Sequence, residues 1–333
     1  MGGDVGEGDL KSLITPTHTL PHQGGGNEWG FFKRKKVSMI VLDALLQGIL
    51  MGLLFALVAL GLTIIFGMMD IVNFAHGEFL MIGMYTTYWT SLLLHIDPLI
   101  TLPASAIVGM LLGLASYYCL VKYLLRGPMI AQLFGTFGLM LFLRYLAQFL
   151  FGTDYRIIQK GLLVGKSLSF GPFILDWTKL STAILGLIAF LFVYYLLHRT
   201  KLGKALRATA LNKEAAAYMG IRTDRMNALA WAIGGGTVGI AGGLLVNFWY
   251  VYPTIGLVFV MIAFASVAMG GFGSIKGAFF AGILIGMIEM LFPMFGHLTG
   301  WDFFGPHFKF TVVYFAYFVI VVLRPQGLFG WTR

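Results

Sequence analysis

The chain has 333 residues, of which 58% are hydrophobic and only 11% are charged. A soluble domain averages about 25% charged residues because its surface has to be hydrated, so this composition excludes a soluble globular protein and requires lipid as much of the solvent. The formal net charge of +9 is gathered in a few clusters between apolar runs, which is typical of membrane proteins and argues against nucleic-acid binding.

The first 38 residues differ in composition from the rest of the chain. Glycines recur throughout this segment, and Pro16 and Pro21 interrupt any helix there. No apolar run follows a basic start, so the segment does not resemble a signal peptide. We expect residues 1–38 to be a disordered or mis-assigned N-terminal extension, with Met39 as the true start, and residues 39–333 to form one membrane domain.

The apolar runs after Met39 predict membrane spans at 41–66, 79–95, 99–121, 129–151, 180–198, 228–250, 256–292 and 308–323. Most are close to the ~20 residues that a bilayer requires. The long run 256–292 contains the glycine-rich stretch Gly270–Gly277 and is expected to split into two passes or a re-entrant pair. The first run is also long enough for two short pieces. The sequence therefore predicts an all-α polytopic membrane protein with about eight transmembrane helices, in a range of about eight to ten, and with broken or re-entrant segments.

The basic residues predict the orientation of the spans. The loop 199–226 is the richest in lysine and arginine, so we expect it in the cytoplasm, with Lys122 and Arg126 on the same side. Arg324 joins them if an even number of passes follows the loop. Segment 152–179 is then outside, where residues 155–158 and 167–170 predict a small hairpin. The basic run 33–36 also favours the inside, which conflicts with three passes before Lys122 unless the first run contains two.

Four polar residues lie between two strongly apolar runs and are flanked by Gly67 and Gly77: Asp70, Asn73, His76 and Glu78. Polar groups at membrane depth are costly unless they pair or face a water-filled path. A helix broken by glycine exposes backbone groups that are tolerated only at such a cavity. The alternative is an interfacial loop in which His76 and Glu78 satisfy each other, and the residues alone leave both interpretations open.

The sequence of residues 72–78, VNFAHGE, followed by MIGMY at 81–85, resembles the signature of the LivH-type branched-chain amino acid ABC transporter permease family. The likeness extends through Thr200–Leu245 and Ser266–Glu289 and covers nearly the whole chain after Met39. It implies that residues 39–333 are a permease domain that translocates branched-chain, hydrophobic amino acids across the bacterial inner membrane. It also implies no enzymatic activity, metal or bound cofactor in this chain, since ATP is used by partner subunits. Permeases for urea or short-chain amides in the same superfamily are similar too and remain an alternative.

The stretch EAAAYMG at 214–220 resembles the EAA loop of ABC importers, the cytoplasmic helix that docks on the ATPase. An alanine-rich helix that ends at Gly220 would present a compact knob to a partner, although no Ile-x-Leu-Pro follows it and a solvated linker has the same pattern. The resemblance implies a coupling loop that includes Arg207, Lys213, Glu214, Ala215, Ala216 and Gly220. The partners it implies are a paralogous second permease subunit, two cytoplasmic ABC ATPase subunits and a periplasmic substrate-binding protein.

Glycines form two further groups. Gly235, Gly239 and their neighbours at 234, 236, 242 and 243 put small residues on one helix face and predict close helix packing. The stretch GGFGS at 270–274 is similar to a glycine block of the family, and its N–H groups are expected to line the substrate path. The pathway candidates are therefore Asp70, Asn73, His76, Glu78, Gly271, Gly273 and Ser274. Arg144, Gln148 and Glu289 lie inside apolar spans, are expected to turn inward, and are further candidates.

Two functions of other classes compete with the importer permease. One is an ion-coupled secondary transporter of amino acids with Glu78, His76 and Asp70 as its relay, and the other is an intramembrane enzyme that uses His76 and Glu78. The stretch 161–167, GLLVGKS, is one residue short of the spacing of a phosphate-binding loop. His76 and Glu78 do not have the spacing of a zinc protease motif.

Overall fold

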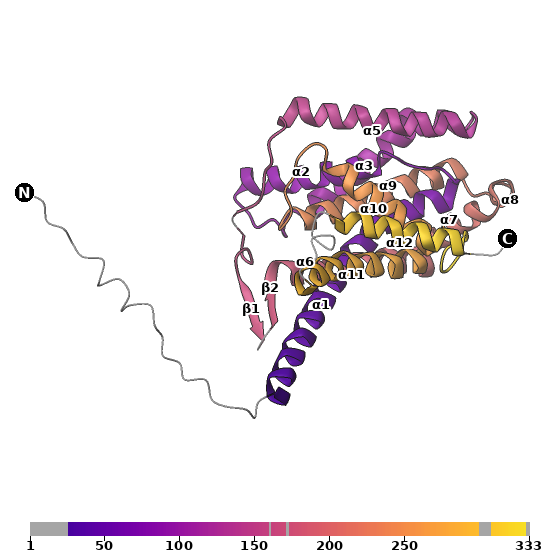
Figure 1. Cartoon of the computed structure of the whole chain (residues 1–333). Helices are drawn as coiled ribbons and strands as arrows, with labels where there is room; N and C mark the ends of the chain where they lie inside the picture. The colour runs from indigo at the N-terminus through magenta and orange to yellow at the C-terminus, as the bar shows by residue number, and fades with distance from the viewer. Residues whose placement is uncertain (1–25, 160, 171–172, 300–307, 331–333) are drawn as a thin grey trace, which may run out of the picture. The chain divides into compact units, whose positions relative to one another are not determined.

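The computed structural model describes residues 26–159, 161–170, 173–299 and 308–330 (Figure 1). The chain divides into two compact units, residues 1–38 and 39–333, and the helix contacts and sites described below belong to the second. Its elements are α1 (Gly26–Met69, which begins in the first unit), α2 (His76–Leu94), α3 (Leu102–Ser116), the π-helix η1 (Tyr117–Val121), α4 (Lys122–Leu124), α5 (Met129–Phe151), β1 (Ser167–Phe170), β2 (Phe173–Asp176), α6 (Trp177–Arg199), α7 (Lys201–Leu211), α8 (Lys213–Tyr218), α9 (Thr223–Leu245), α10 (Ile255–Gly270), α11 (Ile275–Thr299) and α12 (Lys309–Leu323).

The all-α polytopic fold is confirmed. Among the described residues, six helices are long and apolar enough to cross a bilayer: Ser38–Met69, Leu102–Leu124, Met129–Phe151, Trp177–Arg199, Thr223–Leu245 and Ile275–Gly296. The helices α10 and α12 are shorter and apolar. The run 256–292 splits at Gly271–Ser274 into α10 and α11, as predicted.

The N-terminal part adds two observations. The first apolar run forms one continuous helix and not two pieces. It contains no proline, and its glycines Gly48 and Gly52 pack against α11 instead of breaking the helix. The helix α1 already begins at Gly26, within the segment expected to be an extension; no proline follows Pro21 before the apolar run. Residues 1–25 lie outside the described part of the chain.

The basic residues of the loop 199–226 lie at the same end of the helices as Lys122 and Lys276, and we call this the basic end. An ion pair of 3.0 Å between Lys122 Nζ and Asp224 Oδ2 joins α4 to the start of α9. The N–H groups of Leu328 and Phe329, just after α12, donate to the carbonyls of Met269 and Gly270 at the end of α10. Four helices, α9 to α12, separate the loop 199–226 from Arg324. The number of helices is even, and the hydrogen bonds of Leu328 and Phe329 bring the segment after α12 to the end of α10.

The predicted hairpin at the opposite end forms with a different second strand. The strand β1 pairs with β2 in antiparallel register, with Ser167 opposite Asp176 and Phe170 opposite Phe173. Residues 155–158 are not its partner, since Arg156 pairs with Val251 in an isolated bridge. Pairing of β1 with β2 closes a loop of only two residues, which costs less chain entropy than pairing with the more distant segment.

Close backbone packing by glycine, predicted from the sequence, is confirmed. In α9, Gly235 and Gly239 pack against Gly109 of α3, and Gly234 packs against Gly61 of α1. In α1, a Cβ added to Gly52 would lie 2.5 Å from the Cα of Ile283, and Gly286 of α11 is just as close to α1. Helices that approach this closely gain van der Waals contact, which is the main source of association inside a bilayer.

In the described part of the chain, two elements, the π-helix η1 and the helix α5, are not held by glycine contacts of this kind. The helix η1 is a π-turn between α3 and α4; Tyr117 in it donates a hydrogen bond of 2.7 Å to Asp224 Oδ1, and Cys119 is exposed. The helix α5 packs against α2, α4 and η1. Its buried residues form one stripe along the helix: Thr136, Met140, Leu143, Arg144 and Ala147.

Candidate functional site

The polar motif between α1 and α2 is divided into an exposed part and a buried part. Asp70 follows the last residue of α1 with a φ of 52° and donates its N–H to Phe66 O at 2.8 Å. Aspartate tolerates this left-handed conformation better than most residues, so Asp70 acts as a helix-terminating residue. Its side chain is exposed, and it does not join the other three polar residues.

Asn73, His76 and Glu78 are buried together at the start of α2. Asn73 Oδ1 accepts a hydrogen bond from the N–H of Ala75 at 3.1 Å. His76 Nε2 lies 2.9 Å from the carbonyl oxygen of Val58 in α1 and donates to it, since a carbonyl only accepts. His76 and Glu78 therefore do not satisfy each other, and the interfacial-loop interpretation does not describe this site.

Glu78 pairs with Arg144 of α5. Arg144 Nε and Nη2 lie 3.1 Å and 2.5 Å from the same carboxylate oxygen, Oε1. Glu78 is in the first turn of α2, and a Cβ added to Gly256, in the first turn of α10, would lie 2.9 Å from its carboxyl carbon. The carboxylate therefore lies at the N-termini of two helices as well as beside a guanidinium, and each of the three stabilises its negative charge.

Three buried polar atoms in this cluster, Asn73 Nδ2, His76 Nδ1 and Glu78 Oε2, have no hydrogen-bond partner among the described residues. Buried polar groups are normally paired. Such a concentration at one helix start indicates a site that binds a further group or that changes its partners.

The glycine-rich turn 270–274 lies elsewhere, at the basic end. Gly271 and Gly273 have φ angles of 99° and 78°, and Ser274 Oγ caps α11 by accepting from the N–H of Gly277 at 3.1 Å. The N–H groups of Gly271 and Ser274 donate to Ala268 O and Gly271 O within the turn. Gly273 and Ser274 line a cavity of about 530 Å³ that residues of α1, α6 and α7 also line. The pathway candidates thus fall into two groups, one around Glu78 and one at this cavity.

The loop 199–226 folds into two short helices. Arg207 of α7 donates to Leu197 O at 2.9 Å, which fastens α7 to α6, and Ala216 of α8 is buried. Lys213, Glu214 and Ala215 are exposed. Asn212 Oδ1 caps α8 by accepting from the N–H of Ala215 at 2.9 Å. Of the predicted coupling residues, Arg207 and Ala216 hold the loop in place and the others face outward.

Three large apolar side chains of this loop are exposed and escaped the sequence prediction. Leu211 is 88% exposed, Tyr218 89% and Met219 83%. Together with α8 they form what we call the apolar knob, residues 211–219. Apolar residues at these spacings are usually packed inside a protein, so the sequence does not reveal that these three form an exposed apolar surface.

Gly220 ends α8 as predicted, and its replacement tests how much the knob depends on that ending. Its φ is 79°, its N–H donates to Ala217 O, and the N–H of Ile221 donates to Ala216 O, which together form a Schellman motif. No atom would touch an added Cβ, so Gly220→Ala should destabilise this turn by about 1 kcal/mol through backbone strain alone. Hydrogen exchange of residues 213–221 should become about fivefold faster. Gly138→Ala, also without contacts but within helix α5, should leave this exchange unchanged, and equal exchange in both variants would contradict the prediction.

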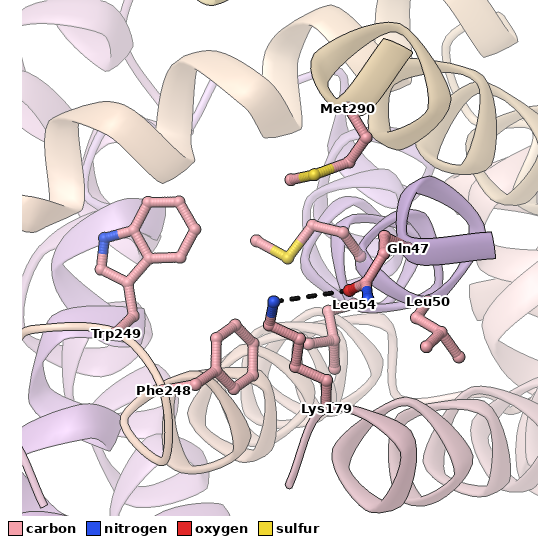
Figure 2. Close-up of a pocket in the computed structure, with 8 residues that line it drawn as sticks. Gln47, Leu50, Leu54, Lys179, Phe248, Trp249 and Met290 are labelled. Atoms are coloured by element: carbon pink, nitrogen blue, oxygen red, sulfur yellow. Dashed lines mark hydrogen bonds between the residues drawn. The ribbon is translucent and has the colours of Figure 1, made fainter. Parts of the chain in front are cut away.

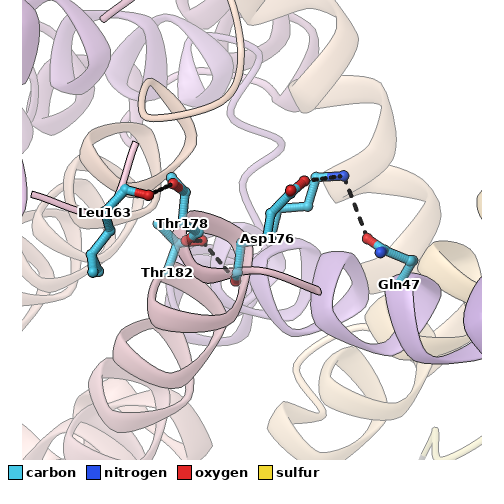
Figure 3. A network of polar contacts seen from close by, with 6 residues as sticks. Gln47, Leu163, Asp176, Thr178 and Thr182 are labelled. Atoms are coloured by element: carbon cyan, nitrogen blue, oxygen red, sulfur yellow. Dashed lines mark hydrogen bonds and ion pairs between the residues drawn. The ribbon is translucent and has the colours of Figure 1, made fainter. Parts of the chain in front are cut away.

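The opposite end holds a smaller cavity of about 190 Å³ (Figure 2). It is lined by Gln47, Leu50, Met51, Leu54, Lys179, Phe248, Trp249 and Met290. Lys179 Nζ lies 3.4 Å from Gln47 Oε1 and 3.5 Å from Asp176 Oδ2, so α6 is tied both to α1 and to the end of the hairpin (Figure 3).

A neighbouring part of the same network fixes the segment 161–167, which is similar to a phosphate-binding loop. Thr178 Oγ1 donates to Leu163 O at 2.9 Å (Figure 3), and Lys166 N–H donates to Leu163 O. No helix of its own follows this segment directly; the hairpin does. The segment therefore lacks the loop-to-helix geometry in which such loops bind phosphate.

Glu289, also expected to turn inward, is buried in a second ion pair. Its Oε1 lies 2.7 Å from Lys309 Nζ, and this pair joins α11 to α12. Among the described residues, no group of three or more His, Cys, Asp or Glu side chains is placed to bind a metal ion.

The matching family and three similar proteins share one description, that of a permease of branched-chain amino acid transport. The family described as "Branched-chain amino acid transport system / permease component" matches residues 44–323. The high-affinity branched-chain amino acid transport system permease protein LivH of Escherichia coli (strain K12) is 30% identical over 308 residues, which cover 87% of this chain and 95% of LivH. BraD of Pseudomonas aeruginosa, with the same description, is 27% identical over 301 residues, with coverage of 87% and 95%. A probable branched-chain amino acid transport permease protein LivH of Methanocaldococcus jannaschii is 28% identical over 291 residues, with coverage of 83% and 89%. No solved structure matches the chain.

Proposed function

Because this chain belongs to the family of permease components of branched-chain amino acid transport systems, we propose that it forms one half of the membrane pathway of an ATP-driven importer of branched-chain amino acids. Membership makes the chain a multi-pass membrane transport subunit and not an enzyme. The partners we propose are a paralogous second permease subunit, two cytoplasmic ABC ATPase subunits and a periplasmic substrate-binding protein. The cofactor of the system, ATP, would be bound by the ATPase subunits.

The observation that carries the proposal beyond family membership is the apolar knob. A short capped helix with exposed Leu211, Tyr218 and Met219 stands in a loop rich in lysine and arginine at the basic end. Large exposed aromatic and methionine side chains are typical of the centre of protein interfaces. This supports the loop as the surface on which an ATPase subunit docks, with Lys213, Glu214, Ala215 and Gly220 on the contact face.

The pathway in this proposal runs past the buried cluster of Asn73, His76 and Glu78 and reaches the basic end beside Gly273 and Ser274. Asp70 lies at the exposed end of α1 and Gly271 in the turn after α10, so both would border the exit. Closure of the ATPase subunits on the apolar knob would move α7 and α6, because Arg207 fastens one helix to the other. Movement of rigid helices around a fixed polar cluster would alternate access to it.

The test is leucine uptake by the complete transporter in liposomes, with the binding protein supplied on one side. We expect uptake that requires ATP hydrolysis and persists when a protonophore abolishes the proton gradient. Uptake that ignores ATP and follows the gradient would instead support an ion-coupled secondary transporter, in which Glu78 and His76 relay the ion. ATP-driven uptake of urea or a short amide without leucine uptake would support the related permease class.

A further inference from the structure

The ion pair between Glu78 and Arg144 is incomplete in its geometry. Both donating nitrogens of Arg144 reach the same oxygen, Oε1, whereas a guanidinium and a carboxylate usually meet through two parallel hydrogen bonds. The second oxygen, Oε2, is buried and accepts no hydrogen bond within the described ranges. The pair therefore leaves one carboxylate oxygen without a hydrogen-bond donor from the described residues.

Both side chains are removed from water. Glu78 is 1% exposed and Arg144 10% exposed. Charges in such a site are stable only when they are paired and hydrogen-bonded on all sides. A ligand that separates Glu78 from Arg144 must supply each of them with a new charged partner. A ligand with a single charge would leave one of the two side chains unpaired. A zwitterion would pair with both side chains.

A cavity opens along the contact between α2 and α5, and its nearest lining residue on α2, Ile82, lies one helical turn from Glu78. It measures about 400 Å³ and is lined by Ile82, Tyr85, Thr86, Trp89, Thr90, Leu93 and Leu94 of α2 and by Phe151 of α5. Ile82 follows Glu78 by one helical turn, and Phe151 follows Arg144 by about two turns, so the cavity and the ion pair share the contact between α2 and α5. The lining is almost entirely apolar and aromatic, which suits a branched aliphatic side chain.

On the other side of the pair, aromatic rings close the contact. Phe74, just before α2, lies 6.2 Å from Phe137 of α5 and 5.4 Å from Phe264 of α10, measured between ring centroids. Beside these rings, Thr136 Oγ1 donates a hydrogen bond of 3.0 Å to Val72 O. The charged pair thus lies between an apolar cavity and an aromatic barrier.

The helix α5 has few attachments that would prevent the pair from separating. Its buried residues form a single stripe, and most of its other large apolar residues are exposed. A small displacement of α5 would part Arg144 from Glu78 without disturbing the glycine contacts that hold α2, α3 and α9 together.

We propose that Glu78 and Arg144 are the substrate-exchange site of the pathway: the α-ammonium group of the amino acid binds Glu78 while its α-carboxylate binds Arg144, and the side chain occupies the apolar cavity of α2 and α5. The ion pair closes on itself when no substrate is present and exchanges partners with the zwitterion as it passes. The inference rests on the proposed function, since it assigns the substrate's charged groups within that pathway.

The variant test uses the complete transporter in liposomes, with uptake normalised to assembled complex. Glu78→Gln should lower leucine uptake at least tenfold while ATP hydrolysis stimulated by the binding protein stays within about twofold of wild type. Asp176→Asn is the control, because it breaks the ion pair of 3.5 Å with Lys179 at the hairpin, and neither residue belongs to the proposed pathway. Its uptake should stay within about threefold of wild type. An equal loss in both variants, or no loss in Glu78→Gln, would overturn the inference.

If Glu78→Gln does not fold, the thermal unfolding of the wild-type complex with leucine and its analogues tests the exchange site instead. In detergent and without binding protein, leucine at tens of millimolar should raise the thermal unfolding midpoint by several degrees. Isoamylamine has the ammonium group alone and 4-methylpentanoate the carboxylate alone, and neither should produce more than a third of that shift. Equal shifts from all three compounds, or none from leucine, would contradict the exchange site. A wild-type complex without ATP-driven leucine uptake would refute the proposed function instead.

Discussion

A Gly77→Val variant should fail to accumulate as folded protein. Gly77 is the second residue of α2, and a Cβ there would run into the carbonyl oxygen of Gly256 in α10 and lie 2.9 Å from the Cβ of Val260. These are a backbone group and the rigid base of a branched side chain, so neither can rotate away. The two helices would have to separate, and Glu78 would lose its contact with the first turn of α10. We expect a loss of more than about 3 kcal/mol in the free energy of unfolding.

The measurement is the yield and the thermal unfolding midpoint of the purified chain in detergent. Gly138→Val is the control, since Gly138 lies in the exposed part of α5 and no atom is within 4 Å of an added Cβ. Valine is also slightly better than glycine inside a helix, so this variant should match the wild type. A Gly77→Val protein with the midpoint of the control would show that α2 and α10 do not meet as described.

The second large effect concerns Tyr218 in the apolar knob. Its side chain is 89% exposed, so Tyr218→Ala should leave the folding of this chain unchanged. Tyrosines buried at the centre of an interface typically contribute about 2 kcal/mol or more to binding. We therefore expect the affinity of the permease for its ATPase subunits to fall about 30-fold, which is about 2 kcal/mol at RT of about 0.6 kcal/mol.

Titration of the purified ATPase subunits onto tagged permease measures this affinity. Tyr195→Ala is the matched control, because Tyr195 is 61% exposed on α6, within a candidate membrane span and outside the loop. It should bind the ATPase subunits as the wild type does. Wild-type affinity in Tyr218→Ala would remove the apolar knob from the proposed interface.

Local sequence signals are enough for most of the fold. The lengths of the apolar runs predict the helices, and the glycines at 270–273 predict the break between α10 and α11, because these signals act within one or two turns. Gly220 likewise predicts the end of α8. The predicted second strand of the hairpin was wrong, although the sequence holds the competing signal: Phe173–Asp176 follows β1 after two residues, and so short a connection costs less chain entropy than one through 159–166.

The site depends on contacts that local signals do not contain. Arg144 pairs with Glu78 across 66 residues of sequence, and the charge of each predicts only that it turns inward. The contact of Gly77 with Gly256 brings two helix N-termini together, which neither segment reveals alone. Asp70 is close to Asn73 and Glu78 in sequence, but the left-handed turn at Asp70 leaves it outside the buried cluster.

The π-turn η1 carries a natural attachment position for a spectroscopic label. Cys119, the single cysteine among 333 residues, is exposed within that turn and lies two residues after Tyr117, which bonds to Asp224 at the start of α9. Because Cys119 lies near the end of the candidate span Leu102–Leu124, a maleimide label that partitions into lipid should attach to this chain at that single position. Such a reporter stands beside the connection between η1 and α9, the helix that follows the proposed docking loop, so in the proposed importer its spectrum should follow ATP binding and release.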